Sequence, residues 1–159
     1  MRKSIYVRDL ARCIEAQGAE ATVVGVDLSG SANRHTGICV LSGDEAYLDL
    51  VKSDDKIIGA VLRAGPAVVS IDSPLGLPRG RCCTRDSCEC RAHGIMRECE
   101  RALRRRGINA FPCLIQSMQG LTERGMRLAE SLRQKGYQVI ESYPGAAQDI
   151  LRFPRKRVG

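Results

Sequence analysis

Aromatic side chains are scarce in this sequence. Its 159 residues include no Trp, two Phe and four Tyr. Proteins that bind single-stranded nucleic acid without sequence preference stack successive bases on several aromatic rings. The composition therefore argues against an extended stacking platform of that kind.

Long apolar runs are also missing. A helix that spans a membrane needs about 18 or more consecutive apolar residues, and the sequence has no such window. The N-terminus carries Arg2 and Lys3, but Arg8, Asp9 and Arg12 interrupt the apolar stretch that a signal peptide requires. We therefore predict a cytoplasmic protein with no membrane contact. In that compartment we expect the eight cysteines to be reduced thiols or metal ligands, not disulfides.

Positive charge exceeds negative charge. The net charge is +7 and the pI is about 9.2, which favours an anionic partner, and we expect nucleic acid. Most of the excess lies between residues 79 and 106, where nine arginines stand against four acids. Within this segment, Arg104 and Arg105 are candidate phosphate contacts. The alternative is that these arginines form the solvated face of a helix.

The sequence repeats one pattern, an apolar run rich in β-branched residues that ends in an acid. Residues 23–27, 67–72 and 137–141 each indicate a buried strand. These runs end in Asp27, Asp72 and Glu141, and turn-forming residues follow each acid. A carboxylate at such a position is costly unless it is paired, protonated or bound to a metal.

The order of the predicted elements indicates an α/β protein. We expect strands at residues 23–27, 36–41, 46–51, 67–71 and 137–141, and helices at residues 54–62, 95–106, 122–135 and 144–151. Thr122 is expected to be the N-cap of its helix. A three-strand meander that joins parallel strands in one mixed sheet, flanked by helices, is typical of the ribonuclease H-like fold. In that fold the first and fourth strands are neighbours, so Asp27 and Asp72 would face each other.

The predicted domain organisation is simple. Residues 1–21 are expected to form a helical extension, and residues 22–159 a single domain. A cysteine-rich insert at residues 79–94 interrupts that domain.

Three acids at equivalent strand ends predict a site for hard divalent cations. Two Mg²⁺ or Mn²⁺ ions can activate water and stabilise the leaving oxygen in phosphodiester hydrolysis. We predict Asp27 as a bridging ligand, with Asp72 and Glu141 as further ligands and catalytic residues. The alternative for each acid is a role in capping a turn or a helix.

The loop after Asp27 is a candidate phosphate contact. Ser29, Ser31 and Asn33 offer polar side chains and backbone amides, and Arg34 adds a charge. The alternative is an ordinary polar turn.

Four cysteines form a second candidate site. Cys82, Cys83, Cys88 and Cys90 lie within nine residues and could bind Zn²⁺ or an iron–sulfur cluster. Because Cys82 and Cys83 are adjacent, we do not expect both to reach one ion easily, and Cys99, Cys113 or His93 could replace one of them. Redox-active thiols and cysteines without a role are the alternatives.

The sequence resembles the DUF429 family of predicted ribonuclease H-like nucleases. The likeness lies in six segments in order: GVDLSG at 25–30, IDSPLGLP at 71–78, GIMREC at 94–99, RRRGI at 104–108, LTERG at 121–125 and VIESYPGA at 139–146. It implies the same fold and a metal-dependent nuclease. It also implies a further C-terminal helix with an Asp-containing motif, which we expect to be missing from a chain that ends at Gly159.

Two other functions remain open at this point. The DLSGS segment at 27–31 resembles the first phosphate hairpin of actin and sugar kinases, although those proteins need two such lobes. A non-catalytic module that binds nucleic acid or a metal is the third possibility.

Overall fold

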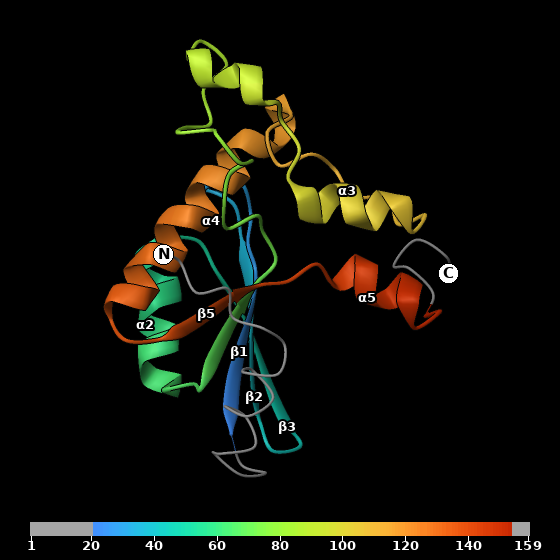
Figure 1. The fold of residues 1–159 in the computed structure, drawn as a ribbon. Helices are drawn as coiled ribbons and strands as arrows, with labels where there is room; N and C mark the ends of the chain where they lie inside the picture. Colours follow the sequence, from blue (N-terminus) through green and yellow to red (C-terminus); the bar gives the residue numbers. More distant parts are fainter. Residues whose placement is uncertain (1–20, 154–159) are drawn as a thin grey trace.

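The computed structural model describes residues 21–153. Five strands form one mixed sheet in the order β3-β2-β1-β4-β5 (Figure 1). The strands are β1 Thr22–Asp27, β2 Thr36–Ser42, β3 Glu45–Val51, β4 Val68–Ile71 and β5 Gln138–Glu141. The helices are α2 Asp54–Ala64, α3 Glu98–Arg105, α4 Gln116–Gln134 and α5 Pro144–Ile150, with a short 3₁₀ helix, η1, at Glu89–His93.

The strand pairing is the one that the sequence predicts. β1, β2 and β3 pair antiparallel as a meander, and β1 and β5 each pair parallel with β4. The prediction that the first and fourth strands are neighbours is confirmed. Because parallel strands point the same way, the C-terminal ends of β1, β4 and β5 meet at one edge of the sheet.

Helices α2 and α4 cover one face of the sheet (Figure 1). Ile57 and Val61 of α2 and Leu128 and Leu132 of α4 are fully buried. They pack on the alternate strand residues that face them, Val24, Val26, Val69, Ile71 and Val139. Alternation along the strands therefore separates the core face from the opposite face.

The opposite face of the sheet is hollowed. A depression of about 1130 Å³ is lined by Gly25 and Gly37, whose missing side chains leave room, and by Cys39, Ser70 and Leu48. Leu48 lies on the edge strand β3 and is 73% exposed. At the C-terminal edge of the sheet, residues of α5 complete the wall of this hollow.

Two helices begin at other residues than predicted. Helix α3 begins at Glu98, three residues after the predicted start. Helix α4 begins at Gln116, six residues before Thr122, so Thr122 is not an N-cap. Its side chain is buried, and its hydroxyl donates to the carbonyl of Cys113 at 2.6 Å. A Thr inside a helix can use its hydroxyl in this way when a neighbouring segment offers an acceptor.

Two predictions concern residues outside the described range. The helical extension predicted for residues 1–21 lies almost wholly outside it, and so does the chain after residue 153, where we expect no further helix. Between residues 21 and 153, no helix combines the length and the apolar character needed to cross a membrane.

Gly125 allows α4 to approach the loop after β4. A Cβ atom at this position would collide with Ser73 Oγ and would lie 3.1 Å from the carbonyl oxygen of Pro74. We therefore expect Gly125→Ala to lower the free energy of unfolding by about 1–3 kcal/mol through overpacking, as measured by urea denaturation. The matched control is Gly59→Ala in α2, where only the far end of Arg63 lies near, and which should be neutral or stabilising by about 0.5–1 kcal/mol. Equal stability of Gly125→Ala and the unmodified protein would contradict this close approach.

Candidate acidic site and cysteine cluster

Two of the three predicted acids share the hollow on the open face of the sheet. Val26 and Ile71 are register partners, so Asp27 and Asp72 occupy adjacent strand ends. The backbone N–H of Asp72 donates to the carbonyl of Val26 at 2.8 Å. Both acids line the hollow, and Asp27 stands against Gly37, where an added Cβ would lie 3.4 Å from Asp27 Cβ.

The surroundings of Asp72 disfavour its charged form. Partial burial raises the pKa of its carboxyl group, and the charges of Asp27 and Glu141 raise it further. A neighbouring cation would reverse these effects, because it favours the ionised form. Asp72 is therefore the centre of an acidic cluster that carries an electrostatic cost as it stands.

Glu141 has a different environment. It is the register partner of Ile71, so it lies on the side of the sheet that faces the helices, and it does not line the hollow. Its Oε2 accepts from Leu75 N at 2.8 Å and from Arg97 at 2.7 Å, and its Oε1 accepts from the same guanidinium at 2.7 Å. The structure thus brings Asp27 and Asp72 together. It places Glu141 beside Asp72, and both carboxylate oxygens of Glu141 accept hydrogen bonds.

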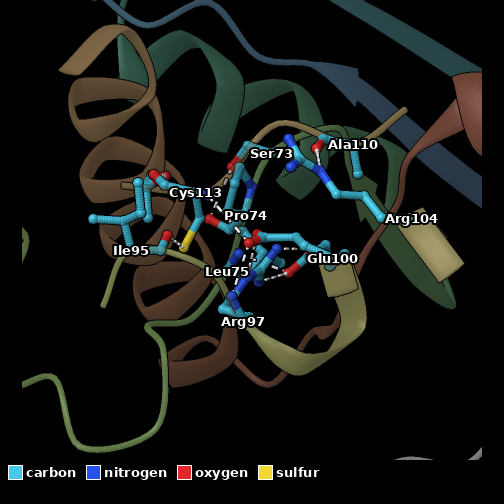
Figure 2. A network of polar contacts seen from close by, with 11 residues as sticks. Ser73, Pro74, Leu75, Ile95, Arg97, Glu100, Arg104, Ala110 and Cys113 are labelled. Atoms are coloured by element: carbon cyan, nitrogen blue, oxygen red, sulfur yellow. Dashed lines mark hydrogen bonds and ion pairs between the residues drawn. The ribbon is translucent and has the colours of Figure 1, made fainter. Parts of the chain in front are cut away.

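Arg97 and Glu100 hold Glu141 in place, and the sequence interpretation assigned neither of them a role. Glu100 is only 4% exposed. It accepts from Arg97 Nε at 2.7 Å and from the backbone N–H groups of Arg97 and Cys113 (Figure 2). Burial alone would lower the pKa of Arg97, but hydrogen bonds and charge from Glu141 and Glu100 raise it well above its usual range. The sequence did contain a signal for the contact between Arg97 and Glu100. An acid at the third position of a helix is typical of a capping box with the residue that precedes the helix.

Arg124 is a second buried arginine that was missed. It is 3% exposed and joins α4 to two other segments. Its guanidinium donates to Asp54 at the start of α2, to the carbonyl of Lys52, and to the carbonyl and hydroxyl of Ser29. It fixes the loop that follows Asp27, and nothing in local periodicity would reveal that role.

The loop after Asp27 uses much of its polar capacity internally. The hydroxyl of Ser29 contacts Thr36, the carbonyls of Ser31 and Arg34, and Arg124. The backbone amides of Ser29, Asn33 and Arg34 donate to Thr36, to the Ser31 hydroxyl and to the Ser31 carbonyl. These groups stabilise the turn, so the side chain of Arg34 is the exposed charge that the loop offers.

The predicted phosphate contacts Arg104 and Arg105 lie on α3 and are exposed. Arg104 Nε donates to the carbonyl of Ala110 at 2.9 Å, and Arg105 pairs with Glu98 at 2.6 Å. An exposed ion pair of this kind contributes little to stability. Both arginines therefore remain accessible to an anion.

The four predicted cysteines of the insert form one cluster. Their sulfur atoms all lie within 4.8 Å of one another, so this group could hold a metal ion. Cys82 and Cys88 are 3.7 Å apart, and Cys83 and Cys90 are 3.8 Å apart. The expectation that the adjacent Cys82 and Cys83 would not easily reach one centre is wrong. The four cysteines complete the group without Cys99, Cys113 or His93.

Arg81 shapes the loop that carries these cysteines. Its buried guanidinium donates to the carbonyls of Cys83, Thr84 and Arg85. These bonds fold the segment between the two pairs of cysteines back on itself. Hydrogen bonding within the cluster separates the pKa values of the thiols: the side chain of Cys90 raises the pKa of Cys82 to about 12, and backbone hydrogen bonding from Cys82 lowers the pKa of Cys90 to about 6. The thiolate is the form of cysteine that binds metals.

The cost of crowding acids around Asp72 is measurable. Because the pKa of Asp72 is raised in the folded state, the folded protein binds more protons than the unfolded chain above about pH 4, and stability falls as the pH rises through the raised pKa. We expect Asp72→Asn to abolish this fall and to raise the free energy of unfolding at pH 7 by roughly 0.5–1 kcal/mol in metal-free buffer. Urea denaturation between pH 4 and 8 measures it. Asp44→Asn, in the exposed turn between β2 and β3, is the control, and the same pH profile for both variants would contradict the assignment.

The comparisons with known proteins give a family and no activity. No curated protein matches the sequence. A family model described as "Protein of unknown function (DUF429)" matches residues 25–153. This match includes the three acids at the strand ends and the four clustered cysteines, and it leaves out only the first residues of β1 among the described elements. The chain therefore belongs to the DUF429 family.

Proposed function

We propose that this protein is a divalent-metal-dependent nuclease that hydrolyses phosphodiester bonds at Asp27 and Asp72. The observation that carries the proposal is the pair of carboxylates at adjacent strand ends in an open hollow of about 1130 Å³. Among the described contacts, neither Asp27 nor Asp72 forms an ion pair with a basic side chain. A bound cation would balance the repulsion between the two carboxylates.

The residues present fit a hard cation. Asp27 and Asp72 supply carboxylate oxygens, which Mg²⁺ and Mn²⁺ prefer. Such ions would supply an activated water and would stabilise the leaving oxygen. Asp27 and Asp72 would hold the ions, whereas the oxygens of Glu141 already accept hydrogen bonds from Arg97 and Leu75. Glu141 would contribute to a metal site only beside these hydrogen bonds, and its main contact is the ion pair with Arg97.

The charge distribution supports a nucleic-acid substrate. Exposed arginines lie on α3 and in the insert, among them Arg91, Arg101, Arg104 and Arg105. Contacts from such residues to phosphates provide affinity without sequence preference.

The kinase-like alternative receives less support. A phosphate hairpin binds its ligand with unpaired backbone amides. In the loop after Asp27, the amides of Ser29, Asn33 and Arg34 already donate within the loop. Nuclease activity is therefore the better use of the neighbouring acids, and a non-catalytic module is the outcome to which a negative cleavage test would point.

The nuclease proposal predicts that Asp27→Asn removes cleavage. Single- and double-stranded DNA, RNA and hybrid substrates should be cut in Mg²⁺ or Mn²⁺ and spared in EDTA. Loss of a metal-binding carboxylate should reduce the rate by about 100-fold or more while leaving the melting temperature unchanged or higher. Asp44→Asn is the matched control and should retain full activity. Undiminished cleavage by Asp27→Asn, or no cleavage of any substrate by the unmodified protein, would overturn the proposal.

We also propose that the cysteine cluster holds one Zn²⁺ ion. Four thiolates about 2.3 Å from a tetrahedral zinc centre stand about 3.8 Å from one another. Two of the sulfur separations, 3.7 and 3.8 Å, match this distance, and all of them lie within 4.8 Å. A four-iron cluster binds each thiolate to a different iron, and a two-iron cluster binds two thiolates on each of its irons. In both cases some thiolates are held by different irons and stand further apart than around one ion, so a single ion fits better.

The role proposed for zinc is structural. None of the residues from Arg79 to Cys90 is a large apolar residue, so this segment has little hydrophobic burial to order it. Metal binding supplies the missing folding energy in segments of this type. It would also fix the approach to Arg97, which follows Cys90 by seven residues.

Elemental analysis tests the zinc proposal. Protein purified without chelators should contain about one zinc per chain, and Cys88→Ser should lose it together with several degrees of thermal stability. Cys99→Ser is the matched control and should keep both. Bound iron, or two disulfides in place of four titratable thiols, would show that the proposal is wrong.

A further inference from the structure

A small recess adjoins the acidic hollow. It has a volume of about 170 Å³ and lies between α3, the start of α4 and the strand ends. Its apolar wall consists of Pro74, Leu103, Ala110, Phe111, Met118 and Leu121. Asp72 and Ser142 line both the recess and the hollow, so the two spaces meet at the central carboxylate.

The size of the recess admits one aromatic ring. An apolar cavity of about 150 Å³ is known to bind benzene, so the 170 Å³ of the recess match the space that a single six-membered ring, such as a pyrimidine base, occupies. Two aromatic residues border it. Phe111 is 61% exposed, and Tyr143 is oriented by the hydrogen bond from its hydroxyl to the carbonyl of Asn109 at 2.8 Å.

The polar side chains that line the recess include Arg97, Ser73, Ser142 and the acids Asp72, Glu100 and Glu141. Among them, Arg97 suits the edge of a base. Its side chain donates three hydrogen bonds to Glu100 and Glu141, and a guanidinium has further N–H donors beyond these three. Pyrimidines carry carbonyl oxygens that accept such bonds. Because Glu100 and Glu141 fix the guanidinium, its remaining donors are held in place before a ligand arrives.

We propose that this recess binds a single unpaired pyrimidine base of the nucleic-acid substrate. Its position outside the C-terminal ends of parallel strands is the usual ligand position in α/β sheets. A base that is stacked and paired in a duplex cannot enter a pocket of this kind. The substrate class is therefore single-stranded nucleic acid, with the base beside Asp72 in the recess. This substrate assignment rests on the proposed nuclease function, whereas binding of the base itself does not.

The first test measures base binding without cleavage. Calorimetry in buffer without added Mg²⁺ or Mn²⁺, and without chelator, should show that thymidine monophosphate binds about ten-fold or more tightly than deoxyribose 5-phosphate and more tightly than deoxyadenosine monophosphate. Leu103→Phe fills the recess and should remove this preference. Leu62→Phe, at a half-exposed position on α2, is the matched control and should bind normally.

The second test locates the bound base. The chain has no Trp, so Phe111→Trp introduces a single Trp beside the recess, whose emission can be excited apart from that of the tyrosines. Thymidine monophosphate should quench its emission at concentrations at which deoxyribose 5-phosphate has no effect. Equal responses to the two ligands, or unchanged binding by Leu103→Phe, would overturn the inference.

The outcomes separate the inference from the nuclease proposal. If binding depends on the base but no substrate is cleaved, the nuclease proposal is wrong and the recess is still a base-binding site. Metal-dependent cleavage at equal rates on oligothymidylate and a duplex, with no base preference in calorimetry, would remove the recess and keep the nuclease.

Discussion

The parallel pairing of β1 with β4 imposes the main electrostatic constraint on this protein. It sets Asp27 and Asp72 at neighbouring strand ends, with Glu141 one strand further. Backbone hydrogen bonds and the buried side chains of the core fix this register, because a shift of one residue would turn the apolar set of a strand away from the helices. The acids therefore cannot move apart while the core stays packed.

The chain treats the three acids differently. Glu141 is neutralised by Arg97, which Glu100 orients from α3. Asp72 and Asp27 have no equivalent guanidinium among the described contacts, and the pKa of Asp72 is raised. Uncompensated neighbouring carboxylates with a perturbed pKa are typical of functional sites, and the repulsion between Asp27 and Asp72 is the feature on which the proposed cation site rests.

Buried arginines connect the site to the rest of the fold. Arg124 ties α4 to the loop after Asp27 and to the start of α2, and Arg81 folds the loop that carries the cysteines. Each guanidinium satisfies several carbonyl or carboxylate groups at once, which an apolar side chain could not do. The positive charge of this chain therefore serves its internal structure as well as its surface.

The sequence by itself determined the strands, most helix boundaries, the neighbouring strand ends of Asp27 and Asp72 and the identity of the four clustered cysteines. These features follow from local periodicity, from turn-forming residues and from the few topologies that such an element order permits. Only the tertiary structure decided that α4 begins before Thr122, that Cys82 and Cys83 converge on one centre, and that Arg97 binds Glu141. The ion pair joins Arg97 and Glu141, which are 44 residues apart, and local pattern carries no information about which distant partner a charged side chain will meet. The cysteines are close in sequence, but their convergence depends on how the buried Arg81 folds the loop between them.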